Sequence, residues 1–371
     1  MRPRSWRRID HLQPLLAGML LALGMMTVYS AHADWVRQLV WIVLGAGAYV
    51  AAAAFDYRRL SVLAPWLYAA TVALLLAVRL AGHSALGAQR WLSLGGFPLQ
   101  PSELSKLTLV LVLAAYLGRT ERASWRGFVV AVALVAPAAA LVLVQPDLGT
   151  TIVIGAVLVG MLFLAGARIA QLGSLAACAA VAFPLLPHIL QGYQRRRLEI
   201  FLNPGSDPLG AGYNLLQARI AVGAGGLFGQ GWLHGLQGAL GYVPERATDF
   251  VFAVFAEQFG LFGSLLLLAV FGALLIRLMR SAAAAPDRFG ALLAGGVFVM
   301  IFAQVTENVG MNIGLLPVAG IPLPLISYGG SATVTTLAAL GLVQSVMLRR
   351  PLLELREPTR LSGNISVRAQ A

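Results

Sequence analysis

Long apolar runs dominate this sequence and leave little choice of fold. Apolar residues make up 58% of the chain and charged residues only 11%, and the mean hydropathy is +0.78. A soluble domain of 371 residues cannot bury that much apolar surface. The sequence therefore predicts an all-α polytopic membrane protein with about ten transmembrane helices, at residues 12–33, 35–55, 61–81, 104–118, 127–145, 150–166, 169–190, 250–277, 289–313 and 330–348.

The basic residues predict the orientation of these helices. When the N-terminus is placed in the cytoplasm and ten helices are threaded, the cytoplasmic segments hold 18 of the 27 basic residues. Positive charge gathers on the cytoplasmic side of membrane proteins, so both termini are expected inside. The net charge of +12 then reflects topology and contact with anionic lipid, and no nucleic-acid partner is expected.

We expect one integral membrane domain over residues 1–371, with a cytoplasmic N-terminus (1–11) and a cytoplasmic tail (351–371). The longest outer segment, 191–249, separates the seventh helix from the eighth. The glycine cluster at 223–231 follows no predicted strand and precedes no Gly-Lys-Ser/Thr motif, so it predicts turns and not a nucleotide site.

Asp249 is the acidic residue that most needs an explanation, because it stands at the mouth of the apolar run 250–277. A carboxylate at membrane depth costs roughly 2.5–3.5 kcal/mol and commonly lines a functional cavity. Capping of the following helix is the simpler alternative.

Glu103 and Lys106 form a second candidate. Lys106 is the only lysine among the 27 basic residues, and a spacing of three residues places both side chains on one helix face. They form either a local ion pair or a pair that contacts the substrate or Asp249 within a polar cavity.

An outer set of basic residues offers positive charge for a phosphate-bearing ligand. The triple arginine that includes Arg195 and Arg197 lies on the predicted outer side, where it can bind a diphosphate or anchor to lipid headgroups. Arg90 beside Trp91, and Arg246 beside Glu245, extend this set.

Two other outer segments contribute candidate residues. Asp147 precedes a predicted helix, where it serves as an N-cap or as a site residue. The proline-rich run 315–330 cannot form one regular helix, and it offers the hydroxyls of Ser327 and Tyr328 to a cavity.

These motifs together resemble the SEDS family of cell-wall polymerases, over nearly the whole chain. The similar segments are Gly87–Leu92, Gln100–Lys106, Gln145–Thr150, Asn203–Asn214, Pro244–Phe250 and Asn308–Gly330. Pro244-Glu245-Arg246 is closer to the elongation branch of the family than to the division branch.

The resemblance implies a ten-helix SEDS fold and a glycosyltransferase that joins lipid II units through β-1,4 bonds and releases undecaprenyl diphosphate during cell elongation. It implies Asp249 as the catalytic residue, a divalent cation (Mg²⁺ or Mn²⁺) and no nucleotide. Lipid II with the growing glycan, a class B penicillin-binding protein and the elongation machinery are the implied partners. The bacterial cytoplasmic (inner) membrane is the implied location.

Two alternatives stay open: a flippase for lipid II, and a non-catalytic scaffold for a cell-wall synthase. The sequence also departs from the family pattern. Ala247 stands where the family usually has histidine, and Glu307 stands where an aliphatic residue is usual.

Overall fold

A computed structural model describes residues 10–81, 83–85, 88–94, 97–121, 123–182, 199–201, 211–235 and 245–350. Residues 1–9 of the predicted N-terminal segment (1–11) and the whole predicted tail (351–371) lie outside the described residues, and the predicted outer segment 191–249 is described only in part.

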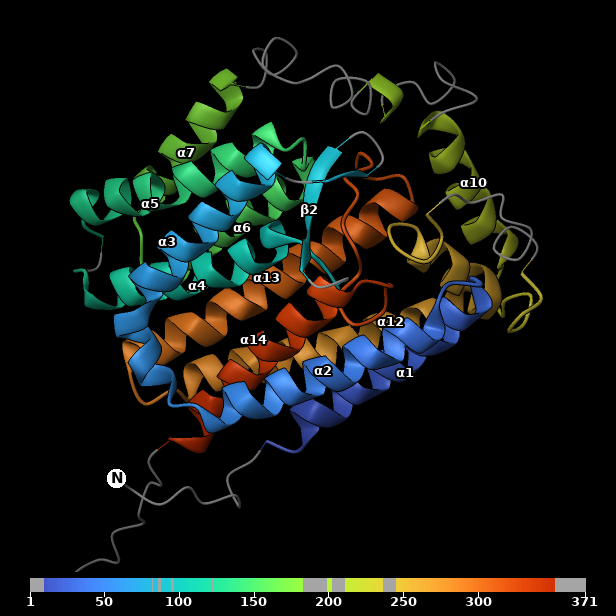
Figure 1. Ribbon diagram of the computed structural model, residues 1–371, viewed down its shortest axis with the longest axis horizontal. Coiled ribbons are helices and arrows are strands. Elements are labelled where there is room, and N and C mark those ends of the chain that lie inside the picture. The colour runs from blue at the N-terminus through green and yellow to red at the C-terminus, as the bar shows by residue number, and fades with distance from the viewer. Residues whose placement is uncertain are drawn as a thin grey trace, which may run out of the picture.

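The described chain is a bundle of apolar helices, as the sequence predicts (Figure 1). Nine of its helices are long and apolar enough to cross a membrane. The helix at the seventh predicted position, α7, is described over 14 residues, and the rest of that predicted run lies beyond the described part. The helices are α1 (Leu12–Ser30), α2 (Trp35–Ala54), α3 (Tyr57–Ala81), α4 (Pro101–Arg119), α5 (Trp125–Val144), α6 (Leu148–Ala165), α7 (Ile169–Ala182), α10 (Ala211–Ala224), α12 (Val251–Ala283), α13 (Arg288–Asn312) and α14 (Gly330–Leu348).

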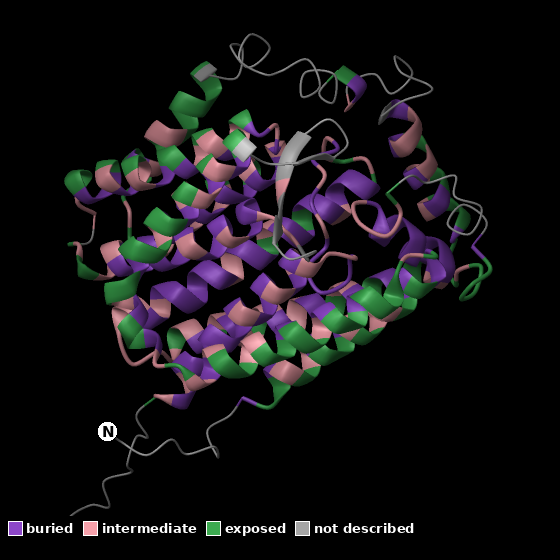
Figure 2. Cartoon of the chain, viewed as in Figure 1, coloured by how far each residue is buried: buried purple, intermediate pink, exposed green. Residues whose placement is uncertain are grey.

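Helix α13 occupies the middle of the bundle, where it contacts α3, α4, α6, α10, α12 and α14. It is largely buried, as are α4 and α14, whereas α2 and α3 are mostly exposed. Figure 2 shows buried residues gathered on the inner helices and exposed ones along α1 and α2. Exposed apolar side chains on these outer helices form the face expected to meet lipid.

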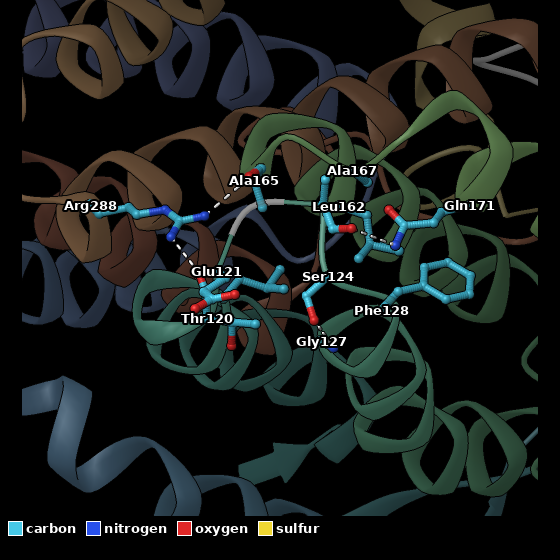
Figure 3. Close-up of a pocket in the computed structure, with 12 residues that line it drawn as sticks. Thr120, Glu121, Ser124, Gly127, Phe128, Leu162, Ala165, Ala167, Gln171 and Arg288 are labelled. Atoms are coloured by element: carbon cyan, nitrogen blue, oxygen red, sulfur yellow. Dashed lines mark hydrogen bonds between the residues drawn. The ribbon is translucent and has the colours of Figure 1, made fainter.

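The two described ends of the chain lie at the same end of the bundle, which we call the terminal end. There the Arg277 guanidinium pairs with Asp10 at 2.6 Å, and Arg349 pairs with Asp56 at 3.3 Å. At this end Arg288 also donates to the main-chain oxygens of Thr120 and Ala165 (Figure 3). The cavity beside Arg288 holds only about 20 Å³, which is room for about one water molecule, so its polar groups serve the loops around them.

The opposite end, which we call the loop end, carries a small sheet that the sequence analysis did not anticipate. Strands β1 (His83–Ala85), β2 (Ala88–Leu94) and β3 (Phe97–Leu99) are antiparallel, in the order β1-β2-β3. The Ser331 hydroxyl joins this sheet to α14, since it donates to the main-chain oxygen of Pro98 at 3.3 Å and accepts from the main-chain N–H of Gln100 at 3.0 Å.

The glycine cluster lies at the loop end and docks into a break in α12. Gly260 has φ 66° inside this helix, so the regular hydrogen-bond ladder is interrupted. The main-chain N–H groups of Gln230 and Gly231 donate to the oxygens of Glu257 and Gln258 at 2.9 and 3.0 Å. The predicted turns are confirmed, and these N–H groups are used within the protein.

Candidate active site

Asp249 lies in a tight turn, residues 245–250, at the start of α12. The turn is closed by the main-chain N–H of Phe250, which donates to the oxygen of Glu245 at 3.2 Å, and by the Thr248 hydroxyl, which donates to the Glu245 carboxylate at 3.0 Å. The N-cap position of α12 is Phe250 and no side chain of that residue caps the helix. Asp249 therefore precedes the N-cap residue of the helix, and it is partly exposed.

Two asparagines of α13 hold the main chain of this turn. The side-chain amide of Asn308 donates to the main-chain oxygen of Asp249 at 2.9 Å, and that of Asn312 donates to the same oxygen at 3.1 Å. The Asn312 side-chain oxygen also accepts from the N–H of Ala253 at 3.1 Å, which supplies the missing cap of α12. Both asparagines are fully buried, so these bonds fix the position of Asp249 against the centre of the bundle.

The segment before α14 holds the other side of the turn. The Ser327 hydroxyl donates to the main-chain oxygen of Thr248 at 2.6 Å and accepts from the N–H of Leu323 at 2.8 Å. The N–H of Tyr328 donates to the oxygen of Ala247 at 2.8 Å. Ser327 is buried and its hydroxyl holds this turn, and its predicted contact with the substrate stays a prediction.

Glu103 and Lys106 form an ion pair within the bundle. The ammonium of Lys106 lies 2.8 Å from the Glu103 carboxylate and 3.0 Å from the side-chain oxygen of Gln304. The two charged side chains are only 3% and 1% exposed, so water does not screen the pair. The predicted ion pair is confirmed, and it joins α4 to α13 through Gln304.

Three residues of α13 connect this pair to Asp249. We call Gln304, Asn308 and Asn312 the α13 polar stripe, because a spacing of four residues puts them along one face of the helix. One helix step of four residues advances about 6 Å. Gln304, which binds Lys106, is therefore about one step of four residues further from the loop end than Asn308, the nearest α13 residue of the stripe that contacts the Asp249 turn.

Asp147 is an N-cap, as one of the two sequence interpretations proposed. Its carboxylate accepts from the main-chain N–H of Thr150 at 3.2 Å and from the Thr150 hydroxyl at 3.0 Å, at the start of α6. It also accepts from the Ser102 hydroxyl at 3.1 Å, which connects it to the first turn of α4. The cap thus lies beside the helix turn that carries Glu103.

The structure describes the remaining predicted site residues only in part. Glu245 and Arg246 are in the same turn as Asp249, Glu245 exposed and Arg246 partly buried. Trp91 and Arg90 are on β2, Trp91 partly buried, and nothing further is described for the Arg90 side chain. Arg195 and Arg197 lie outside the described residues, so their predicted role stays a prediction.

The described residues contain no group of three or more His, Cys, Asp or Glu side chains that could hold a metal ion. Mg²⁺ is commonly bound through one or two carboxylates together with substrate phosphates. The Asp249 carboxylate fits that pattern, in which the substrate supplies the other oxygens.

Sequence reasoning missed Asn308, Asn312 and Gln304 as residues of the site. A signal was present, because three amides recur at a spacing of four residues inside a largely apolar helix. Their partners are main-chain oxygens and a distant lysine, and these contacts are not visible in the sequence.

The geometry can now be compared with known proteins. A family model described as cell cycle protein, for FtsW, RodA and SpoVE, matches residues 12–350. The chain belongs to this family. Its resemblance to the SEDS polymerases and its polytopic helical fold are thereby confirmed.

Individual members of the FtsW, RodA and SpoVE family match over nearly their whole length. The chain is 41% identical to the peptidoglycan glycosyltransferase MrdB of Escherichia coli K12, over 94% of this chain and 96% of that protein. It is 37% identical to the stage V sporulation protein E of Bacillus subtilis, over 91% and 96%.

Solved structures agree with this family. A chain of a peptidoglycan synthase complex, described as coordinating polymerization and crosslinking, superposes with a TM-score of 0.82 at 36% identity, over 94% of this chain and 100% of that one. The rod shape determining protein RodA of Thermus thermophilus gives a TM-score of 0.71 at 32% identity, over 93% and 98%.

Proposed function

We propose that this chain is a peptidoglycan glycosyltransferase that polymerises lipid II into glycan strands during cell elongation. The observation that carries the proposal is the Asp249 turn, in which the main chain is bound by buried side chains of α13 and by the segment before α14. The names of the MrdB and FtsW relatives support the same activity.

Asp249 is the general base of this reaction. The acceptor sugar hydroxyl must lose a proton as it attacks the anomeric carbon of the donor, and a carboxylate within hydrogen-bond reach can take it. Direct attack inverts that carbon, and one carboxylate suffices because the diphosphate leaving group is already activated. Ala247 replaces the usual histidine, so the proton passes to Asp249 without that helper.

Positive charge stabilises the departing diphosphate. Arg246 is in the same turn as Asp249 and is the nearest candidate in sequence, and Arg195 and Arg197 are the candidates from the long outer segment. Lys106 is bonded to Glu103 and Gln304, so its contribution is to hold α4 and α13 together and to place a fixed positive charge below the Asp249 turn.

A divalent cation, Mg²⁺ or Mn²⁺, enters the proposal only with the substrate. One oxygen of the Asp249 carboxylate would be its protein ligand while the other takes the proton, and the diphosphate oxygens would complete its coordination. When bound, such an ion supplies positive charge to the leaving group.

The protein is a multi-pass protein of the bacterial inner membrane, and we place its loop end outside. The arginines of the terminal end, such as Arg58, Arg277 and Arg349, favour that end as the cytoplasmic one. Asp249 then meets lipid II at the outer face. The partner is a class B penicillin-binding protein, consistent with the similarity to a peptidoglycan synthase complex.

The alternatives, a lipid II flippase and a non-catalytic scaffold, are separated from the polymerase by one assay. Purified protein with its synthase partner is given lipid II in detergent, where no transport is needed, and the glycan products are resolved by length. The polymerase predicts long glycan strands. Well-folded protein that yields none would exclude the polymerase and leave the other two functions.

A further inference from the structure

A second cavity lies between α6 and α13, on a lipid-facing side of the bundle. Its volume is about 500 Å³, within the range of ligand pockets. The wall from α6 includes Ile152, Ala156 and Gly160, and the wall from α13 includes Phe298, Phe302 and Glu307. Ile152 and Phe302 are also exposed on the surface, so the cavity opens toward the membrane.

Glu307 is the one charged residue among those that line this cavity. It is 4% exposed, and neither of its carboxyl oxygens has a hydrogen-bond partner in the structure. Lys106 gives it no hydrogen bond, and the ammonium is bonded to Glu103 and Gln304 instead. Burying a carboxyl without a hydrogen-bond partner costs free energy, because the group has lost its contacts with water. A ligand that supplies a hydrogen-bond partner recovers part of that cost, which favours its binding.

The cavity has the length of one membrane leaflet. Ile152 and Gly160 are eight residues apart on α6, which is about 12 Å along the helix axis. One leaflet of the hydrocarbon core is about 15 Å thick, half of the total. A partner transmembrane helix would run through both leaflets, whereas an acyl chain fills one. Glu307, Leu316 and Pro317 lie toward the loop end, where the head of such a lipid would be.

The Glu307 carboxyl indicates which chemical group of a lipid it can bind. Apolar surroundings disfavour an isolated carboxylate, and the uncharged acid donates one O–H hydrogen bond. The ester carbonyl of a glycerophospholipid is an acceptor attached directly to an acyl chain. An isoprenoid chain has no such carbonyl.

We propose that the cavity between α6 and α13 binds one acyl chain of an ester-linked glycerophospholipid, with Glu307 donating a hydrogen bond to its ester carbonyl. This site is separate from the Asp249 turn and does not depend on the proposed function.

The test is a competition between diester and diether phosphatidylglycerol with matched chains, mixed in equal amounts with the purified full chain. Retained lipid is identified by native mass spectrometry. The wild type should favour the diester about five-fold, the effect of one net hydrogen bond. Glu307→Gln, whose amide also donates, should keep a preference for the diester.

Two further variants and one control test whether Glu307 and the cavity are responsible for the lipid preference. Glu307→Val removes an unpartnered polar group, so it should fold and should bind both lipids equally. Ala156→Phe should fill the cavity and reduce the binding of both. Val129→Phe, on the exposed face of α5, is the matched control and should bind like the wild type.

Four outcomes would overturn the proposal. One is equal retention of diester and diether by the wild type, and another is a diester preference that survives Glu307→Val. The third is unchanged binding to Ala156→Phe. A polyprenyl phosphate that displaces the diester from the wild type would assign the cavity to an isoprenoid chain instead.

Discussion

The side-chain amide of Asn308 donates a hydrogen bond to the main-chain oxygen of Asp249 at 2.9 Å. The same amide donates to the main-chain oxygen of Ile321 at 2.7 Å. One buried side chain in the central helix thus joins the turn that carries the proposed base to the proline-rich segment before α14. The position of Asp249 is determined by α13 as much as by its own turn.

Replacing Asn308 by alanine should therefore impair catalysis more than it impairs folding. The change leaves the buried carbonyl of Ile321 without this donor and leaves the carbonyl of Asp249 with Asn312 alone, at a cost of about 1–3 kcal/mol in the free energy of unfolding. A misplaced base should lower the polymerisation rate at least about tenfold, which corresponds to about 1.4 kcal/mol in the barrier. Lipid II polymerisation and thermal unfolding of the same preparation measure the two effects.

Gln344→Leu is the control for Asn308→Ala. Gln344 is also a buried amide, but its side-chain atoms have no hydrogen-bond partner in the structure. This variant should polymerise lipid II at close to the wild-type rate. Equal rates for Asn308→Ala and the wild type would show that Asp249 does not need the contact from α13.

Variants of the Glu103–Lys106 pair can separate its contribution to stability from its contribution to activity. Lys106→Met alone leaves a buried carboxylate unpaired, and loss of one partner of such a pair costs about 3–5 kcal/mol. The double variant Glu103→Leu, Lys106→Met should regain most of that stability, because apolar residues can replace a buried pair. We expect the stable double variant to polymerise at least about tenfold more slowly, because the link from Lys106 of α4 to Gln304 of α13 is gone. A double variant that is both stable and fully active would reduce the pair to a structural contact.

The docked glycine cluster predicts a contrast between two nearby glycines. A Cβ at Gly229 would lie 2.1 Å from the main-chain oxygen of Gln258, and this glycine has φ 84°. Gly229→Ala should lower the melting temperature and disturb the break in α12, with a cost of about 1–3 kcal/mol.

Gly223→Ala is the matched change for Gly229→Ala. Gly223 lies within α10 and has no heavy atom within 4 Å of an added Cβ, so alanine should stabilise that helix by about 0.5–1 kcal/mol. If the two variants had the same melting temperature, the contact between the cluster and the break in α12 would not contribute to stability.

Asp147 allows capping to be separated from a role in the reaction. Asparagine is as good an N-cap as aspartate, whereas alanine loses about 1 kcal/mol. If the cap is the main task of Asp147, Asp147→Asn should keep the wild-type melting temperature and polymerisation rate, and Asp147→Ala should lose stability. An inactive but stable Asp147→Asn protein would give the carboxylate charge a part in the reaction.

The helical bundle was predictable because apolar runs of membrane length have few other folds. The predicted run 104–118 corresponds to α4, Pro101–Arg119, and the predicted irregular run 315–330 lies between α13 and α14. The Glu103–Lys106 pair was predictable for a similar reason, since both residues belong to one helix and their spacing fixes the geometry.

The contacts between distant segments were not predictable in the same way. The sequence shows three amides on α13, but it does not show that Asn308 and Asn312 bind the main chain of Asp249, 59 and 63 residues away. The break at Gly260 was hidden within one long apolar run, because its compensating hydrogen bonds come from residues 226–231. The contact of Ser331 that joins the small sheet to α14 likewise has no local signature.

The central claim is that the Asp249 carboxylate is the base for glycan extension. Its most direct test is the initial rate of lipid II polymerisation by purified protein with its synthase partner, for the wild type and for Asp249→Asn. Asparagine keeps the size and the main-chain contacts of the turn, so the variant should fold with an unchanged melting temperature. The account predicts that its rate falls by about 10²–10⁴-fold, the usual contribution of a general base. A folded Asp249→Asn protein that makes glycan at the wild-type rate would contradict it.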